Sequence, residues 1–309
     1  MLLKENIPIS YVFGKIKKEI LILTLYSAAV YFVHSYYNFT GIKVPLAVLS
    51  VLGTVISLLL AFRSNQAYDR WWEARILWGK IVNDSRSFAR QVLSFVDNSY
   101  DDADKMAMKE RMIRRQMAWC HTLSRHLRKQ TTIESAVNFV SKEEMVGLKK
   151  VDHVPLALME NHANDLRLLL RLGWVNEYQQ VKMDEMLTRL TDSMGGCERI
   201  KNTVFPTTYS VYIRFLVLLF VILLPFGLIE FFGIFQIPLV VAISSSFFLI
   251  EKMAIHLQDP FESQPTDTPT TTISRKIERD LKQLLKDDYP KAETENTFVK
   301  HEGGVFYIL

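Results

Sequence analysis

The sequence predicts an all-α membrane protein with four transmembrane helices and a helical cytoplasmic domain inserted between the second and the third. The first observation is a set of four apolar runs, each near the length of about 20 residues that a bilayer span needs. The second is that Lys and Arg flank these runs on one side only. The third is that apolar residues recur at helical spacing between the second and third runs.

The four runs cover residues 20–33, 44–62, 215–232 and 237–250. The first is not read as a cleaved signal peptide, because a second run follows directly and no small-residue cleavage site separates them. The second run passes at Arg63 into a polar, aromatic segment reaching Trp72, with no Pro or Gly between them. This continuity predicts one rigid helix that joins the membrane domain to the soluble domain.

The charge placement predicts the orientation of the chain. Lys15, Lys17 and Lys18 precede the first run, Arg63 and Arg70 follow the second, and the two short connections hold only Lys43. The positive-inside bias therefore puts both termini and the middle of the chain in the cytoplasm of a multi-pass inner or plasma membrane protein. The expected division is residues 1–62 for the first two spans, 63–210 for the cytoplasmic domain, 211–257 for spans three and four, and 258–309 for a cytoplasmic loop and helix.

Helical periodicity continues through the soluble residues. The helical periodicity from Trp71 onward is expected to break at residues 101–104. A basic helix should follow over residues 104–129. Two more helices are expected near 161–172 and 176–194, the latter ended by Gly195-Gly196. A last amphipathic helix should begin near Thr272, and the final residues are read as frayed or as an edge contact. Cys120 and Cys197 fall in the cytoplasmic part, so both are expected to be reduced thiols.

No motif points to an enzyme. Metalloprotease, phosphate-loop, nucleophile-elbow and Cys-x-x-Cys patterns are absent from the sequence, and the histidines are interpreted as surface or packing residues. We therefore expect no metal, cofactor or catalytic residue. No span carries a charge at its centre, which weighs against a proton relay or an ion-coupled transporter. The Asn38-Phe-Thr triplet fits a glycosylation acceptor, a pattern that often arises by chance.

The basic helix over 104–129 leaves three interpretations open. A solvated face is favoured, and contact with lipid headgroups or an electropositive vestibule are the alternatives. The helix lacks the interleaved exposed aromatics that bind single-stranded nucleic acid, so no nucleic-acid partner is expected.

The second span carries a stripe of special interest. Thr54, Leu58 and Phe62 are four residues apart and share one face of the helix. Periodicity alone favours a lipid-facing or core stripe. The functional alternative is a pore constriction, in which copies of this helix around a symmetry axis form apolar rings that gate by dewetting. That alternative requires a homo-oligomer, because four spans cannot enclose a pore.

Several motifs in order resemble the bestrophin family, especially its bacterial branch. They are FRSNQAYDRWWEARILWGKIV after the second run, GGCERI at residues 195–200 with Pro206 behind it, and HLQDPFE at residues 256–262. The resemblance covers about residues 3–285. It implies a homopentameric channel for small monovalent ions, with a central pore, an apolar neck from the second helix and a cytoplasmic aperture.

The resemblance assigns positions to that pore. It places the neck at Thr54, Leu58 and Phe62 and reverses the preference that periodicity gave, while Thr54 departs from the large apolar residue expected at the outer ring. The cytoplasmic aperture falls on Tyr178. The acidic run that forms a Ca²⁺ clasp in animal members is replaced after Asp259-Pro260-Phe261 by a loop with few carboxylates, so no clasp is expected.

The sign of the permeating ion stays open. The resemblance implies a chloride-type anion channel, and cation selectivity is the alternative in the bacterial branch. The basic helix would favour anions if it lined the vestibule, whereas Glu177 would favour cations if it faced the pore. The competing functions are a membrane scaffold or receptor that signals through its cytoplasmic helices, and a membrane-embedded enzyme.

Overall fold

The computed structural model describes residues 13–37, 43–96, 103–203, 206–287, 298–301 and 305–308. Its elements are α2 (Lys17–Tyr37), α3 (Leu46–Phe95), α4 (Ala103–Leu127), η1 (Ile133–Ser135), α5 (Lys142–Leu148), α6 (Val154–Arg171), α7 (Glu177–Asn202), α8 (Thr207–Phe232), η2 (Gly233–Phe235), α9 (Gln236–Gln258), α10 (Thr270–Leu284), β1 (Phe298–His301) and β2 (Val305–Ile308). Asn38 lies outside the described residues.

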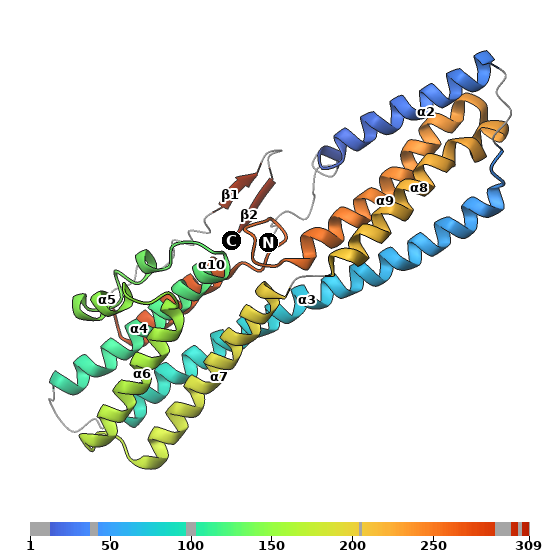
Figure 1. Ribbon diagram of the computed structural model, residues 1–309. Helices are drawn as coiled ribbons and strands as arrows, with labels where there is room; N and C mark the ends of the chain where they lie inside the picture. Colours follow the sequence, from blue (N-terminus) through green and yellow to red (C-terminus); the bar gives the residue numbers. More distant parts are fainter. Residues whose placement is uncertain are drawn as a thin grey trace.

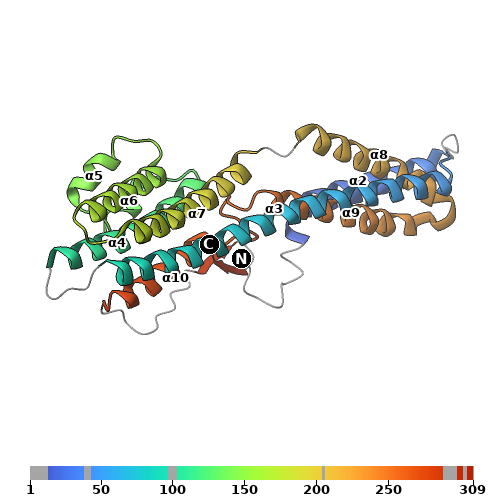
Figure 2. The ribbon, with the colours of Figure 1, turned by 90° about the horizontal axis from the view of Figure 1, so that it is seen from below.

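The molecule is an elongated helical protein with two ends joined by α3. Helices α8 and α9 pack against one side of the first half of α3, with α2 beyond them, and α4, α7 and α10 pack against its second half, with α5 and α6 beyond them (Figures 1 and 2). Each end has its own apolar core. The predicted continuity of the second span is confirmed, because α3 is a single helix of 50 residues.

The described chain has three stretches long and apolar enough to cross a membrane. They are α2, α3 and the stretch Thr207–Gln258, which contains α8, the turn η2 and α9. Inside α8, Pro225 removes one helical hydrogen bond, and the Tyr26 hydroxyl of α2 donates to the Ile222 carbonyl at 2.7 Å. These apolar stretches indicate that the chain is a membrane protein.

The predicted boundary at Gly195-Gly196 is wrong, because α7 runs through both glycines to Asn202. The reason is close packing against α3. A Cβ at Gly196 would lie 2.9 Å from Leu77 Cδ1, so a larger residue would require the Leu77 side chain to move. Glycine here permits helix contact rather than ending a helix.

This pair of glycines gives a matched test of helix packing. Among the described residues, no atom lies within 4 Å of a Cβ built at Gly195. Gly195→Ala should therefore stabilise the protein by about 0.5–1 kcal/mol through helix propensity. Gly196→Ala should lose that gain or destabilise, because Leu77 must move. Thermal unfolding of both variants measures the difference, and equal melting temperatures would contradict the packing argument.

Other boundaries also differ from the expectation. Helix α6 begins at Val154 rather than near residue 161, because His153 caps it and Pro155 occupies its first turn. Helix α10 begins at Thr270. The final residues hold a two-stranded antiparallel hairpin, β1 and β2, so the chain is not entirely α-helical. The basic helix, α4, ends at Leu127.

Both cysteines are buried and neither is in a disulfide. Burial raises the pKa of each thiol to about 12, so neither is a reactive thiolate at neutral pH.

Candidate functional site

The predicted neck residues lie on the outer face of α3. The Leu58 and Phe62 side chains are 56% and 53% exposed in the single chain, and Thr54 is exposed as well. Ile56 and Leu60 are buried in the core of the membrane end. At 100° per residue, Leu58 lies about 160° around the helix from either of them. The stripe therefore points away from the bundle formed by α2, α8 and α9.

The Thr54 hydroxyl is turned back onto its own helix. It donates to the Ser50 carbonyl at 2.8 Å, and Ser57 donates in the same way to Gly53. A hydroxyl engaged with the helix backbone presents less unsatisfied polarity to its surroundings. The side chain at the outer position of the stripe is thus smaller than Leu or Phe, and the hydrogen-bonding capacity of its one polar atom is partly satisfied.

The exposed face does not stop at the end of the apolar run. It continues at three- or four-residue steps to Asn83 and resumes at Arg90 and Ser94, so that one side of this 50-residue helix has no covering element in the described chain. The exposed positions of this α3 face are Val51, Thr54, Val55, Leu58, Phe62, Asn65, Asp69, Trp72, Ile76, Lys80, Asn83, Arg90 and Ser94. They change from apolar to mixed and charged as α3 leaves the membrane end.

Tyr178, the predicted aperture residue, lies in the first turn of α7 and is 86% exposed. A capping box between Asn176 and Gln179 fixes this turn. The exposed side of α7 beyond it forms a shallow hollow of about 440 Å³. Its lining residues are Gln180, Val181, Asp184, Glu185, Thr188 and Arg189.

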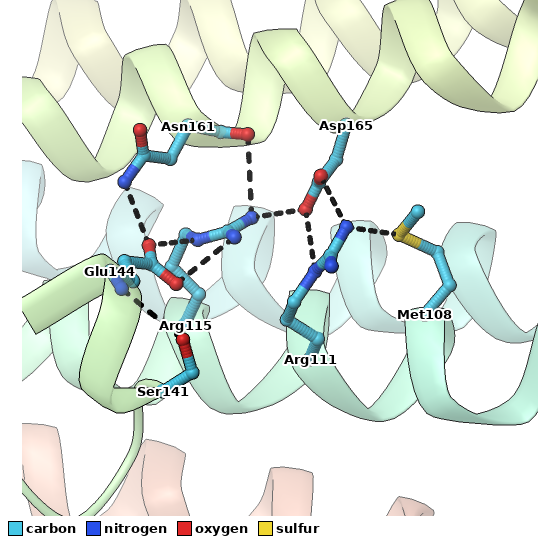
Figure 3. A network of polar contacts seen from close by, with 7 residues as sticks. All are labelled: Met108, Arg111, Arg115, Ser141, Glu144, Asn161 and Asp165. Carbon is cyan, nitrogen blue, oxygen red and sulfur yellow. Dashed lines mark hydrogen bonds and ion pairs between the residues drawn. The ribbon is translucent and has the colours of Figure 1, made fainter. Parts of the chain in front are cut away.

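Two basic side chains of α4 are not on a solvated face, whereas Arg111 is exposed. Lys109 and Arg115 are buried. Arg115 forms ion pairs with Glu144 and with Asp165 at 2.5 Å each, and Asp165 also pairs with Arg111 (Figure 3). The favoured solvated face is therefore wrong for Lys109 and Arg115. The carboxylates that neutralise Arg115 come from α5 and α6, and sequence spacing does not place them beside α4.

The two ends of the molecule are tied together by Arg70 of α3. Its Nη2 donates to the Ile200 carbonyl at 2.7 Å, and its Nε donates to the Gln258 carbonyl at 2.9 Å. These carbonyls belong to the last turns of α7 and α9, whose final carbonyls have no partner inside the helix. Next to it, Trp71 Nε1 donates to the Thr266 carbonyl. The DRWW motif therefore joins the membrane helices to the soluble helices, a role that its sequence alone does not reveal.

The loop from Asp259 to Pro269 holds three carboxylates. Asp259 lies 3.9 Å from Arg70, and Glu262 pairs with Lys201 at 2.5 Å. Asp267 is fully buried, and burial raises its pKa to about 6. The Gln264 backbone and the Arg128 guanidinium oppose this shift.

The sequence is similar to those of known proteins. The family model for bacterial and fungal bestrophin proteins matches residues 6–283. The voltage-dependent anion channel-forming protein alr2987 of Nostoc is 30% identical over 283 residues, and the match covers 88% of each chain. The voltage-dependent anion channel-forming protein YneE of Escherichia coli K12 is 32% identical over 273 residues, again with 88% of each chain covered.

The fold matches solved structures as well. A bacterial bestrophin homolog from Klebsiella pneumoniae superposes with a TM-score of 0.83 and 26% sequence identity, over 89% of this chain and 100% of that one. The match spans both ends of the molecule, so the similarity to the bestrophin homolog covers the helical fold as a whole.

Proposed function

The chain belongs to the bacterial and fungal bestrophin family, and from that premise we propose that it forms a homopentameric ion channel. The observation that carries the proposal is the uncovered face of α3. In the membrane end such a face could meet lipid, but the same face continues past Arg63, where exposed Trp72 and Ile76 would meet water. Five copies arranged around an axis would turn this face toward a pore or a neighbouring subunit.

In this arrangement the chain crosses the membrane four times, with α8 and α9 as separate crossings and both termini in the cytoplasm of the inner membrane. Leu58 and Phe62 form two apolar rings, and Thr54 forms a smaller third ring. Apolar rings of this kind close a pore by excluding water rather than by binding an ion. Tyr178 lines a second constriction at the far end of the cytoplasmic domain, where its exposed ring has room to face the axis.

The permeating ion is proposed to be a small monovalent anion, as the names of the relatives suggest. The charges within the subunit bear on this choice. Arg111, Arg114 and Arg115 of α4 pair with carboxylates of the same chain and lend it little support. The exposed bases of α3, Lys80 and Arg90, are candidates to attract anions. Glu177 and Asp184 on α7 are the groups that would favour cations instead.

A reversal potential measured across a KCl gradient tests conduction and ion sign together. Purified protein in a planar bilayer should carry current, and the reversal potential should move toward that of chloride. A shift toward potassium would assign cation selectivity and leave the channel intact. No current from the wild type or from a Leu58→Ala/Phe62→Ala variant would overturn the channel and favour a scaffold or receptor.

Calcium is not proposed as a ligand of the loop from Asp259 to Pro269. Two of its carboxylates already lie near basic side chains, Arg70 and Lys201, and a Ca²⁺ ion needs six to eight oxygens. A current that depended on micromolar Ca²⁺ would contradict this.

A further inference from the structure

Three side chains of the kind that bind transition metals converge on one side of the cytoplasmic domain. His126 lies in the last turn of α4, His153 is the N-cap of α6, and Glu198 lies near the end of α7. The Glu198 Oε1 atom is 2.8 Å from His153 Nε2 and 3.6 Å from His126 Nε2. All three ligand atoms lie within 4.8 Å of one another.

These separations approach those of a metal site. Zinc binds imidazole and carboxylate at about 2.0–2.2 Å, which puts tetrahedral ligand atoms about 3.3 Å apart. The two observed separations lie on either side of that value. The two imidazole rings have centroids 4.4 Å apart, so small rotations would bring both nitrogens to one point.

The surroundings leave an open position for a fourth ligand. A cavity of about 450 Å³ begins at His126 and is lined by the loop before η1 and by Lys149, Val151 and Asp152. All three ligand residues are partly buried rather than freely exposed. A metal ion held by three side chains at the edge of this cavity would complete its shell with water.

A hydrogen bond from the helix backbone fixes the tautomer of one of the ligands. His153 Nδ1 accepts a hydrogen bond from the Leu156 backbone N–H at 3.1 Å, which places the proton of the neutral ring on Nε2. Binding a metal at Nε2 requires the other tautomer, with the proton on Nδ1. It therefore breaks both the cap bond and the hydrogen bond of 2.8 Å between Nε2 and Glu198 Oε1, and exchanges these two hydrogen bonds for metal–ligand bonds.

We propose that His126, His153 and Glu198 bind one divalent transition-metal ion of the zinc class and so link α4, α6 and α7. Imidazole and carboxylate together are ligands that suit zinc. The expectation of no metal site rested on sequence spacing, and spacing does not show this cluster, because its members come from three separate helices. The proposal is independent of conduction, since it concerns only the folded subunit.

The test is a titration of the full-length protein in detergent, stripped with EDTA, with Zn²⁺ alone. We expect one ion bound per chain. His126→Ala and Glu198→Gln should each weaken the affinity at least 100-fold. His121→Ala is the matched control, because His121 also pairs with a glutamate, Glu278, at 2.8 Å but belongs to no three-ligand cluster among the described residues. Its Zn²⁺ affinity should equal that of the wild type.

His153→Asn separates metal binding from helix capping. Asn is a good N-cap residue, so this variant should keep its melting temperature without metal and yet lose Zn²⁺ affinity. Co²⁺ provides a second readout, because a tetrahedral site gives strong visible absorption bands that His126→Ala should abolish. The proposal is overturned if the wild type binds no Zn²⁺, or if binding is unchanged in both His126→Ala and Glu198→Gln.

Discussion

Alanine at both Leu58 and Phe62 should raise the single-channel current or the open probability several-fold. Both side chains are exposed on the α3 face that points away from the membrane bundle, and neither supports the core. Truncating them widens two apolar rings, so water enters the neck more readily and the barrier to ion passage falls. Single-channel recording in a planar bilayer measures the effect.

Leu25→Ala is the control for this experiment. Leu25 is an equally exposed apolar residue in the membrane end, but it lies on α2 rather than on α3. Its truncation should leave the current unchanged. Thr54→Val should lower the open probability, since it removes the one hydroxyl of the stripe. If currents of the Leu58→Ala/Phe62→Ala variant match those of the wild type, the stripe is structural and the neck lies elsewhere.

Arg115→Ala should destabilise the protein by about 3–5 kcal/mol, the cost typical of breaking a buried ion pair from one side. The Arg115 side chain is 4% exposed and pairs with two carboxylates that are nearly as buried. Burial alone would lower its pKa, but Glu144 and Asp165 outweigh burial and hold the pKa above its usual value. Without the guanidinium, Glu144 keeps only a hydrogen bond from Asn161 and its first-turn position in α5.

Thermal unfolding followed by tryptophan fluorescence measures this loss. Arg125→Ala is the matched control, because its ion pair with Glu134 is largely exposed and is worth at most about 1 kcal/mol. Adding Glu144→Gln to Arg115→Ala should recover part of the stability, since it removes a charge left without its partner. Equal melting temperatures for Arg115→Ala and Arg125→Ala would show that the network contributes little.

The features that the sequence predicts well are those set by local pattern. The length of the apolar runs and the absence of Pro or Gly around Arg63 predict α3, and the four-residue spacing predicts that Thr54, Leu58 and Phe62 share a face. Boundaries are less well predicted where a glycine has two possible roles. Gly196 lies at a contact between helices and does not end α7. Only the position of Leu77 in the structure distinguishes these two roles.

The parts of the candidate site that the sequence does not predict depend on distant partners. The excess of Arg on α4 resembles a surface until Glu144 and Asp165 are placed beside it. Arg70 has no local feature that marks it as the link between α7 and α9. Periodicity also could not separate a lipid-facing stripe from a pore-facing one, because both are exposed in one subunit.

The unbroken length of α3 has a mechanical consequence. About 50 Å of helix extends from Phe62 to Phe95 at 1.5 Å per residue, so a tilt of about 5° at the neck would displace the far end by roughly 4 Å. With no hinge in between, α3 acts as a lever. In the proposed channel, a movement of α4 to α7 would therefore strain or tilt the neck, and a widening of the neck would be accommodated at the opposite end of α3.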